Sequence, residues 1–415
     1  MSLPLLRPPA AATVDPYALG REGLRELLAD QPAFRAEQVH RWLVRGVDDP
    51  AAMTDLPLEL RQRLTELLDP PPKILRRSTA DDGLTHKVLL QMSSGEAVES
   101  VLMLYPRRDH RAKPRATVCI STQAGCAMGC PFCATGQAGF RGQLGLGEVV
   151  RQVTVMQRLL QDDDVAPATS ARSQERTADV PDHVTNVVFM GMGEPLANLA
   201  TTVAAVRWLH DDFGLSARSI TVSTVGLVPG IRRLTKLGLP ITLAVSLHAP
   251  NDELRDLLVP VNRQHPLAEL LAASHDYLLA TGRRLTFEYV LIGGINDARR
   301  HAEQLAELVG SVPQVHVNLI PMNPTPAVPW RAPGRDVQEA FAAVLTGAGI
   351  STTIRRNRGG EIDAACGQLY ADYAVASGRM LPSAVGAADR VQRSAAADDP
   401  RAGRGQPSSP GPMRR

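Results

Sequence analysis

Three of the five cysteines lie close together in the segment CAMGCPFCATG, where Cys126, Cys130 and Cys133 have the spacing C-x3-C-x2-C. Thiolates are good ligands for iron–sulfur clusters. Three thiolates on a four-iron cluster leave one iron open, much as a catalytic zinc site keeps an open position. Because an open iron binds a substrate and passes it an electron, the spacing predicts a reactive cluster.

The alternative is a zinc site or a set of inert thiols. Zinc needs a fourth ligand, and no His or Cys follows Cys133 at finger-like spacing. The other two cysteines, Cys119 and Cys366, lie outside the motif. An odd number of cysteines in a chain of 415 residues argues against a disulfide framework.

The elements that must position the cysteines follow an alternating pattern. Helical patterns at 147–160, 199–213 and 301–310 separate short strand-like runs, which lie at 116–121, 185–190, 219–223, 241–246, 285–292 and 315–320. Such alternation predicts an α/β fold with a parallel sheet and right-handed crossovers. Six units are too few for a closed eight-stranded barrel, so we expect a partial (β/α)6 barrel, which a strand at 351–356 extends.

Outside the barrel, the sequence divides into further regions. We expect a helical module at 1–75, a β-hairpin linker region at 76–114, the barrel with a catalytic C-terminal segment at 115–375, and a disordered tail at 376–415. The polar stretch 161–182 interrupts the barrel and is also expected to be disordered. No apolar run approaches the ~20 residues of a membrane span. The first residues lack the pattern of a secretion signal, so we expect a cytoplasmic protein.

Polar residues and glycines recur just after the expected strands, where such a fold gathers its active-site loops. Taken singly, each is an ordinary cap or loop residue. Taken together, they outline one pocket, formed by Gly193, Glu194, Ser223, Ser246, Leu247, His248 and Asn323.

The strings CISTQAGCAMGCPFCATG, FMGMGEPLAN, VSLHAPND and RRNRGGEIDAACGQL resemble the bacterial adenine-C2 RNA methyltransferases of the radical S-adenosylmethionine superfamily. The resemblance extends from about residue 20 to about residue 375. It implies one [4Fe-4S] cluster on the three clustered cysteines, two S-adenosylmethionine molecules per turnover held by the pocket residues, and 23S rRNA and tRNA as substrates. It also implies an electron donor such as flavodoxin, and we expect a monomer.

The resemblance assigns roles to the remaining cysteines. Adenine C2 has no lone pair and cannot attack the methyl group of S-adenosylmethionine directly. In this family a cysteine, here Cys366, is methylated first, and a 5′-deoxyadenosyl radical from a second S-adenosylmethionine then removes hydrogen from that methyl. The carbon radical adds to C2, and Cys119 releases the product by forming a transient disulfide. Glu99 matches the family's proton acceptor. Without the resemblance, Cys119 and Cys366 read as buried structural thiols, and Glu99 as an exposed strand residue.

RNA affinity is expected from two arginine-rich runs, one at 107–115 and one at 355–358, although such runs are often plain solvated surface. In the helical module, Arg35, Gln38 and Arg41 are the candidate contacts. The target base must leave its stack to reach a buried pocket.

Three other functions remain open. The first is a sister enzyme that methylates C8 of the same adenine and confers antibiotic resistance. The second is a radical-generating activase that acts on a protein. The third is an iron–sulfur or zinc RNA-binding protein without catalysis.

Overall fold

The computed structural model describes residues 13–107, 113–161, 180–312, 314–355, 358–369 and 391. Within them, one ten-stranded sheet has the order β1-β2-β3-β4-β7-β8-β9-β10-β11-β12. Most of the 161–182 stretch and the expected tail lie outside the described residues.

The barrel part of the sheet consists of parallel strands in chain order, which are β4 (Arg115–Cys119), β7 (Asn186–Phe189), β8 (Ile220–Thr224), β9 (Thr242–Ser246), β10 (Leu285–Leu291), β11 (Val315–Pro321) and β12 (Ser351–Ile354). Every residue of β10 is buried, as expected for a parallel strand covered on both faces. In the described part of the chain, the two ends of the sheet do not pair with each other, so the predicted partial barrel is confirmed.

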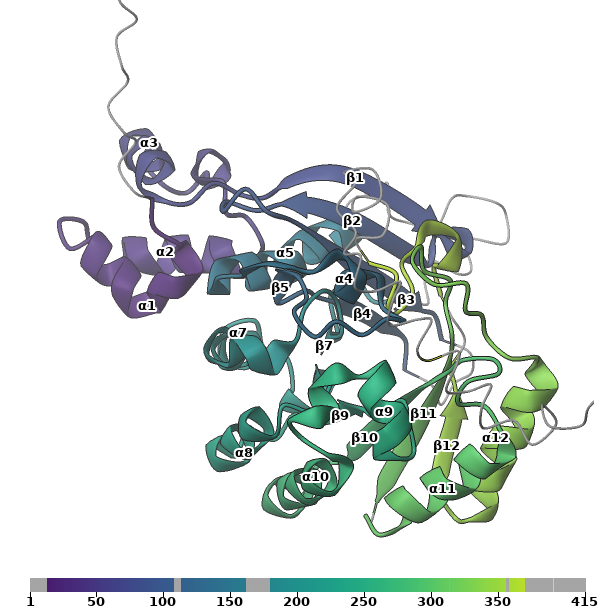
Figure 1. Cartoon of the computed structure of the whole chain (residues 1–415). Coiled ribbons are helices and arrows are strands. Elements are labelled where there is room, and N and C mark those ends of the chain that lie inside the picture. Colours follow the sequence, from purple (N-terminus) through teal and green to yellow (C-terminus); the bar gives the residue numbers. More distant parts are fainter. Residues whose placement is uncertain are drawn as a thin grey trace, which may run out of the picture.

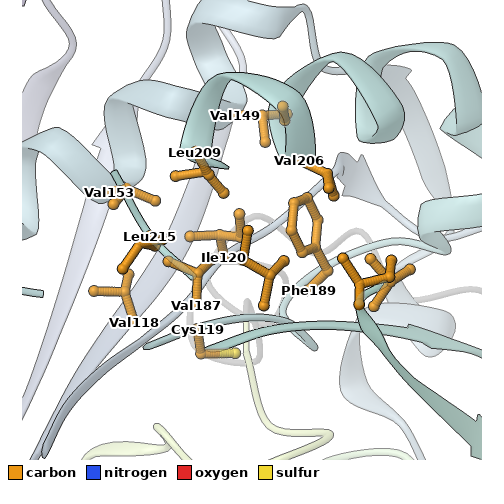
Figure 2. Packing of buried hydrophobic residues seen from close by; sticks show 14 of the residues in the cluster. Val118, Cys119, Ile120, Val149, Val153, Val187, Phe189, Val206, Leu209 and Leu215 are labelled. Atoms are coloured by element: carbon orange, nitrogen blue, oxygen red, sulfur yellow. The ribbon is translucent and has the colours of Figure 1, made fainter. Parts of the chain in front are cut away.

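Helices follow the strands and cover the outer face of the sheet (Figure 1), and they are α5 (Leu146–Gln161), α7 (Leu199–Asp211), α8 (Val228–Leu237), α10 (Leu267–Thr281), α11 (Arg299–Gly310) and α12 (Arg335–Gly347). Short helices α4 (Ala134–Ala138) and α9 (Asp252–Leu258) lie in the loops after β4 and β9. Figure 2 shows Val149, Val153, Val206 and Leu209 packing on Val187 and Phe189 of the sheet. No helix in the described part of the chain is long and apolar enough to cross a membrane.

The expected hairpin belongs to the main sheet. Its strands β2 (Thr85–Gln91) and β3 (Ala97–Tyr105) pair antiparallel, and β3 also pairs antiparallel with β4. A strand that was not expected, β1 (Lys73–Ala80), adds the outer edge. Backbone hydrogen bonds between β3 and β4 therefore join this hairpin to the barrel sheet.

The N-terminal module contains α1 (Pro16–Leu27), α2 (Phe34–Val44) and α3 (Leu58–Leu67) and lies beside α5 (Figure 1). A buried ion pair joins it to the barrel, since Arg151 Nε of α5 lies 2.8 Å from Asp48 Oδ2. Arg151 also donates to the Asp69 carbonyl. Removing one partner of such a buried pair is costly, so the module is firmly seated.

Candidate active site

A cavity opens at the carboxyl ends of the parallel strands and contains most of the predicted site residues. Its lining includes Cys126, Cys130, Cys133, Gly193, Glu194, Ser223, Ser246, His248, Asn323 and Cys366. Segments far apart in the sequence therefore meet in one place, as the carboxyl ends of barrel strands require.

The loop that carries the cysteine motif is shaped by short backbone contacts. The Cys126 N–H donates to the Gly139 carbonyl, and the Cys133 N–H donates to the Cys130 carbonyl. Gly125 has a φ of +74°, and a Cβ there would stand 1.9 Å from the Gly139 oxygen. Only glycine allows the backbone at Gly125 to come this close to Gly139, and this contact holds the start of the cysteine loop against its end.

Cys130 is buried, Cys126 and Cys133 are half-buried, and none of the three belongs to a disulfide. Burial, with Cys133 nearby, raises the pKa of Cys126 to about 12, and burial likewise raises the pKa values of Cys130 and Cys133. Among the described residues, no three Cys, His, Asp or Glu side chains are placed to hold a single metal ion. Three sulfurs from one loop around a shared cavity suit a cluster, whose ligands each bind a different iron. Cys366 lines the same cavity but comes from a different segment of the chain.

Glu194 connects the loops after β7 and β8. Its carboxylate accepts the Leu196 N–H at 2.9 Å and the Val225 N–H at 2.8 Å. Burial raises the pKa of Glu194 to about 7, although these N–H groups oppose the shift. Gly193 before it has a φ of +94°, and a Cβ there would lie 2.5 Å from Gln123 Cβ. The turn therefore requires glycine and presents Glu194 to the cavity.

The other predicted pocket residues differ in where they lie. Ser223, Ser246, His248 and Asn323 line the cavity, whereas the Leu247 side chain is fully buried in the main core. His248 Nδ1 accepts the Val290 N–H at 3.1 Å. Burial lowers the pKa of His248 to about 3, so its ring is neutral at ordinary pH.

Sequence reasoning missed Arg255, which is fully buried in α9. Its guanidinium donates to the carbonyls of Val225, Ser246 and Leu247 and to Asn262 Oδ1. These carbonyls follow β8 and β9, so a single side chain fixes two loops of the cavity wall. Burial lowers the pKa of Arg255 to about 10, with Cys130 the largest opposing influence.

Cys119 ends β4 and lies on the opposite side of the sheet from its neighbours. Figure 2 shows Val118 and Ile120 toward the helices and Cys119 pointing away from them. Cys119 and Cys366 both line a second cavity that adjoins the first. Burial, followed by the nearby Cys366, raises the pKa of Cys119 to about 12.

Arg355 lies at the junction of the two cavities and lines both. Its Nη1 is 3.4 Å from Glu288 Oε2. Cys366 is the largest influence that raises the pKa of Arg355, and Glu288 acts in the same direction. Arg355 therefore places a positive charge beside the Cys366 sulfur.

The segment 358–369, here called the C-terminal segment, positions Cys366. Gly359 N–H donates to Asp81 Oδ2 at its start, and Gly367 accepts the Ala134 N–H of α4 near its end. Asn323 Nδ2 donates to the Cys366 carbonyl at 3.0 Å. The segment thus spans from the hairpin to the cysteine loop.

Glu99 is buried in β3 and does not line either cavity. Its Oε1 lies 3.1 Å from Lys87 Nζ, and Lys87 also donates to the Asp363 carbonyl of the C-terminal segment. Sequence reasoning missed Lys87, although a lone lysine in the apolar run THKVLLQM was a signal, because buried lysines are almost always paired.

The three candidate RNA contacts of the N-terminal module gather around Asp55. Arg35 donates to the Asp55 carbonyl, Gln38 to its Oδ2, and Arg41 lies 3.9 Å from the same oxygen. The carboxylate offsets part of their positive charge, so their role in RNA binding stays a prediction.

Comparisons with known proteins agree with this geometry. Residues 120–309 match the family model of the radical SAM superfamily, and residues 17–69 match that of the ribosomal RNA large subunit methyltransferase N-terminal domain.

Similar proteins cover most of the chain. A probable dual-specificity RNA methyltransferase RlmN from Frankia casuarinae is 50% identical over 353 residues, which are 83% of this chain and 79% of that protein. A relative of the same name from Roseiflexus castenholzii is 49% identical, with 85% and 95% covered. The crystal structure of a radical SAM methyltransferase from Sphaerobacter thermophilus has a TM-score of 0.76 at 46% identity, and the match covers 86% of this chain and 98% of that one.

Proposed function

Because the chain belongs to the RlmN family of dual-specificity RNA methyltransferases, we propose that it methylates C2 of one adenine in the peptidyl transferase centre of 23S rRNA and of one adenine in the tRNA anticodon loop. The observation that carries this proposal is the position of Cys366, which lines both the cavity of the three clustered cysteines and the cavity of Cys119.

S-adenosylmethionine is used twice in this proposal. Cys366 first attacks the methyl group of one molecule, and Arg355 lines the same cavities beside it. For a second molecule, Glu194 accepts hydrogen bonds from the amino group, and Ser223, Ser246 and Asn323 line the rest of the cavity. Leu247 contributes no lining, so any contact from it would come through its backbone.

Cys126, Cys130 and Cys133 would hold one [4Fe-4S] cluster, which when bound supplies the electron that cleaves S-adenosylmethionine. Arg255 keeps the cavity wall fixed around that site through its bonds to Val225 and Ser246.

The carbon radical on Cys366 adds to adenine C2, and the adduct then loses the C2 hydrogen as a proton and one electron to an external one-electron acceptor. The carbon–sulfur bond must break next. Cys119 loses its proton and attacks the Cys366 sulfur, a disulfide forms, and the bonding electrons and a proton complete the methyl group on the base. The disulfide is then reduced by an external thiol. For Glu99 we propose the proton-accepting role that the resemblance implies, and its contact through Lys87 to the C-terminal segment supports it.

The remaining expectations complete the proposal. A flavodoxin-type protein donates the electron. The enzyme acts as a monomer in the cytoplasm, where its RNA substrates are found. The module at 1–75 assists RNA binding, and the barrel at 115–375 carries the chemistry.

The test is anaerobic reconstitution with iron, sulfide, S-adenosylmethionine, a reductant and a 23S rRNA fragment, followed by mass spectrometry of the digested RNA. We expect 2-methyladenosine together with 5′-deoxyadenosine from the wild type, and no methylated adenosine from Cys366→Ala. Formation of 8-methyladenosine would assign the chain to the C8 reaction. Full activity of Cys366→Ala would favour an activase, and absence of 5′-deoxyadenosine would favour a binding protein.

A further inference from the structure

The two arginine-rich runs meet at one aromatic ring. Tyr105 ends β3 and pairs with Arg115 at the start of β4. The Arg115 guanidinium carbon lies 4.3 Å from the ring centroid, and that of Arg358 lies 4.2 Å from it. Arg358 also donates from Nη1 to the Leu104 carbonyl at 2.7 Å. We call Arg115, Tyr105 and Arg358 the arginine–tyrosine stack.

The stack belongs to the second cavity. All three of its residues line that cavity together with Cys119 and Cys366. Arg115 is exposed, and Tyr105 and Arg358 are half-buried, so the stack faces solvent on one side and the two thiols on the other. A ligand bound in this cavity can therefore contact both the stack and the two thiols.

The charges around the stack are unbalanced. In the part of the chain that the structure describes, no carboxylate forms an ion pair with Arg115 or Arg358, and Arg355 adds a third guanidinium to the same cavity. Glu288 lies beside Arg355, and Asp81 accepts the Gly359 N–H and the Thr85 hydroxyl. Arg115 and Arg358 contact one ring, so both positive charges act on the same surface, and an anion bound there is attracted by both.

We propose that the arginine–tyrosine stack binds the RNA phosphodiester that flanks the adenine being methylated. Guanidinium groups match the geometry of phosphate oxygens, and the ring that both contact helps to hold them in place before RNA arrives. With the adenine turned into the cavity of Cys366, its own backbone stays at the solvent side, where the stack lies. This inference rests on the proposed function, since it takes RNA as the substrate.

The test uses the reconstituted holoenzyme and a fluorescent RNA hairpin containing the target adenine, with affinity measured by anisotropy over a series of salt concentrations. Each of Arg115→Gln and Arg358→Gln is expected to weaken binding roughly three- to tenfold and to reduce the slope of log affinity against log salt by about one. The double variant should lose about two from that slope. Tyr105→Phe keeps the ring and should bind like the wild type.

Two kinds of control separate the stack from general effects. Arg299→Gln and Arg335→Gln remove exposed arginines of α11 and α12, which pair with Glu303 and Glu339, and should leave affinity and slope unchanged. Arg358→Lys keeps the charge, so it should keep the slope even where the bond to Leu104 is lost.

The outcomes are distinguishable. If the wild type binds RNA and the double variant binds with the same affinity and slope, this inference is overturned and the proposed function stands. If the double variant binds weakly but keeps the wild-type slope, the stack is structural and the inference is also overturned. A wild type that binds no RNA overturns both the inference and the proposed function.

Discussion

The cysteine loop and the thiol pair face the same space but are built differently. Cys126, Cys130 and Cys133 come from one loop, which glycine contacts such as that of Gly125 with Gly139 hold in place. Cys119 comes from β4, and Cys366 comes from the C-terminal segment far along the chain. The first site depends on local backbone geometry, whereas the second depends on long-range contacts.

In the proposed reaction, this difference separates two tasks. A cluster needs three ligands at fixed separation, which a short motif provides. A thiol that carries a methyl group to RNA must reach one partner after another, and Cys366 is exposed on a segment anchored at both ends by hydrogen bonds. Each prediction below changes one of the two regions and leaves the other intact.

The largest expected effect comes from Cys130→Ala. Loss of one of three cluster ligands should remove bound iron and reduce 5′-deoxyadenosine formation by more than about 1,000-fold, equivalent to about 4 kcal/mol. Iron analysis and chromatography of the nucleoside measure it. Cys119→Ala is the matched control and should keep both iron and nucleoside formation, since Cys119 lies in the other cavity. Equal iron loss in the two variants would contradict the separation between the cluster ligands and the Cys119–Cys366 pair.

The reactivity of Cys119 is the next effect in size. Its pKa is raised from 9.0 to about 12, so at pH 8 it holds roughly 1,000-fold less thiolate than an ordinary thiol. A raised pKa means that alkylation should increase tenfold per pH unit up to about pH 12. Peptide mass spectrometry after iodoacetamide treatment should find the exposed Cys366 labelled first. Labelling of Cys119 that levels off near pH 9 would contradict the burial argument.

Arg255→Met tests the wall of the cysteine-loop cavity. It leaves the buried carbonyls of Val225, Ser246 and Leu247 without their donor and should lower the free energy of unfolding by about 3–5 kcal/mol. Urea unfolding measures this free energy, and the dependence of that free energy on urea concentration should be unchanged. Arg335→Gln, on the exposed face of α12, should change the same quantity by less than about 0.5 kcal/mol. If the free energy of unfolding of Arg255→Met changed as little as that of the control, the hydrogen bonds of Arg255 would contribute nothing to stability.

Gly193→Ala has the smallest expected effect, a loss of about 1–3 kcal/mol, because the added Cβ meets Gln123 and the backbone has positive φ. The affinity for S-adenosylmethionine should also fall, because the added methyl group displaces Glu194. Calorimetric titration and thermal unfolding check the two effects. Gly142→Ala serves as the control, since its Cβ would meet nothing within 4 Å. Unchanged affinity in Gly193→Ala would separate the turn from the cofactor site.

The sequence predicted the parallel strands to within one or two residues, because alternating apolar runs and intervening helices leave few other folds. It missed β1, whose residues are mostly exposed and therefore lack an apolar pattern. The cysteine loop could be predicted from spacing alone. Arg255 could not, nor could the partners of Lys87, because the groups that these side chains contact are carbonyls and a carboxylate from other elements.

The convergence of the two arginine-rich runs was also beyond the sequence. It requires the register that places Tyr105 opposite Arg115, and the path that brings Arg358 back to the hairpin. Leu247 shows the same limit in reverse, since it adjoins the cavity residues Ser246 and His248 but points into the core.

The central claim is that Cys366 carries the methyl carbon to adenine C2 and Cys119 releases it. The most direct measurement is mass spectrometry of Cys119→Ala incubated anaerobically with S-adenosylmethionine, reductant and RNA. We predict a covalent adduct in which one carbon joins the Cys366 sulfur to C2 of the target adenine. Formation of 2-methyladenosine at the wild-type rate without an adduct, or an adduct on another residue, would contradict the claim.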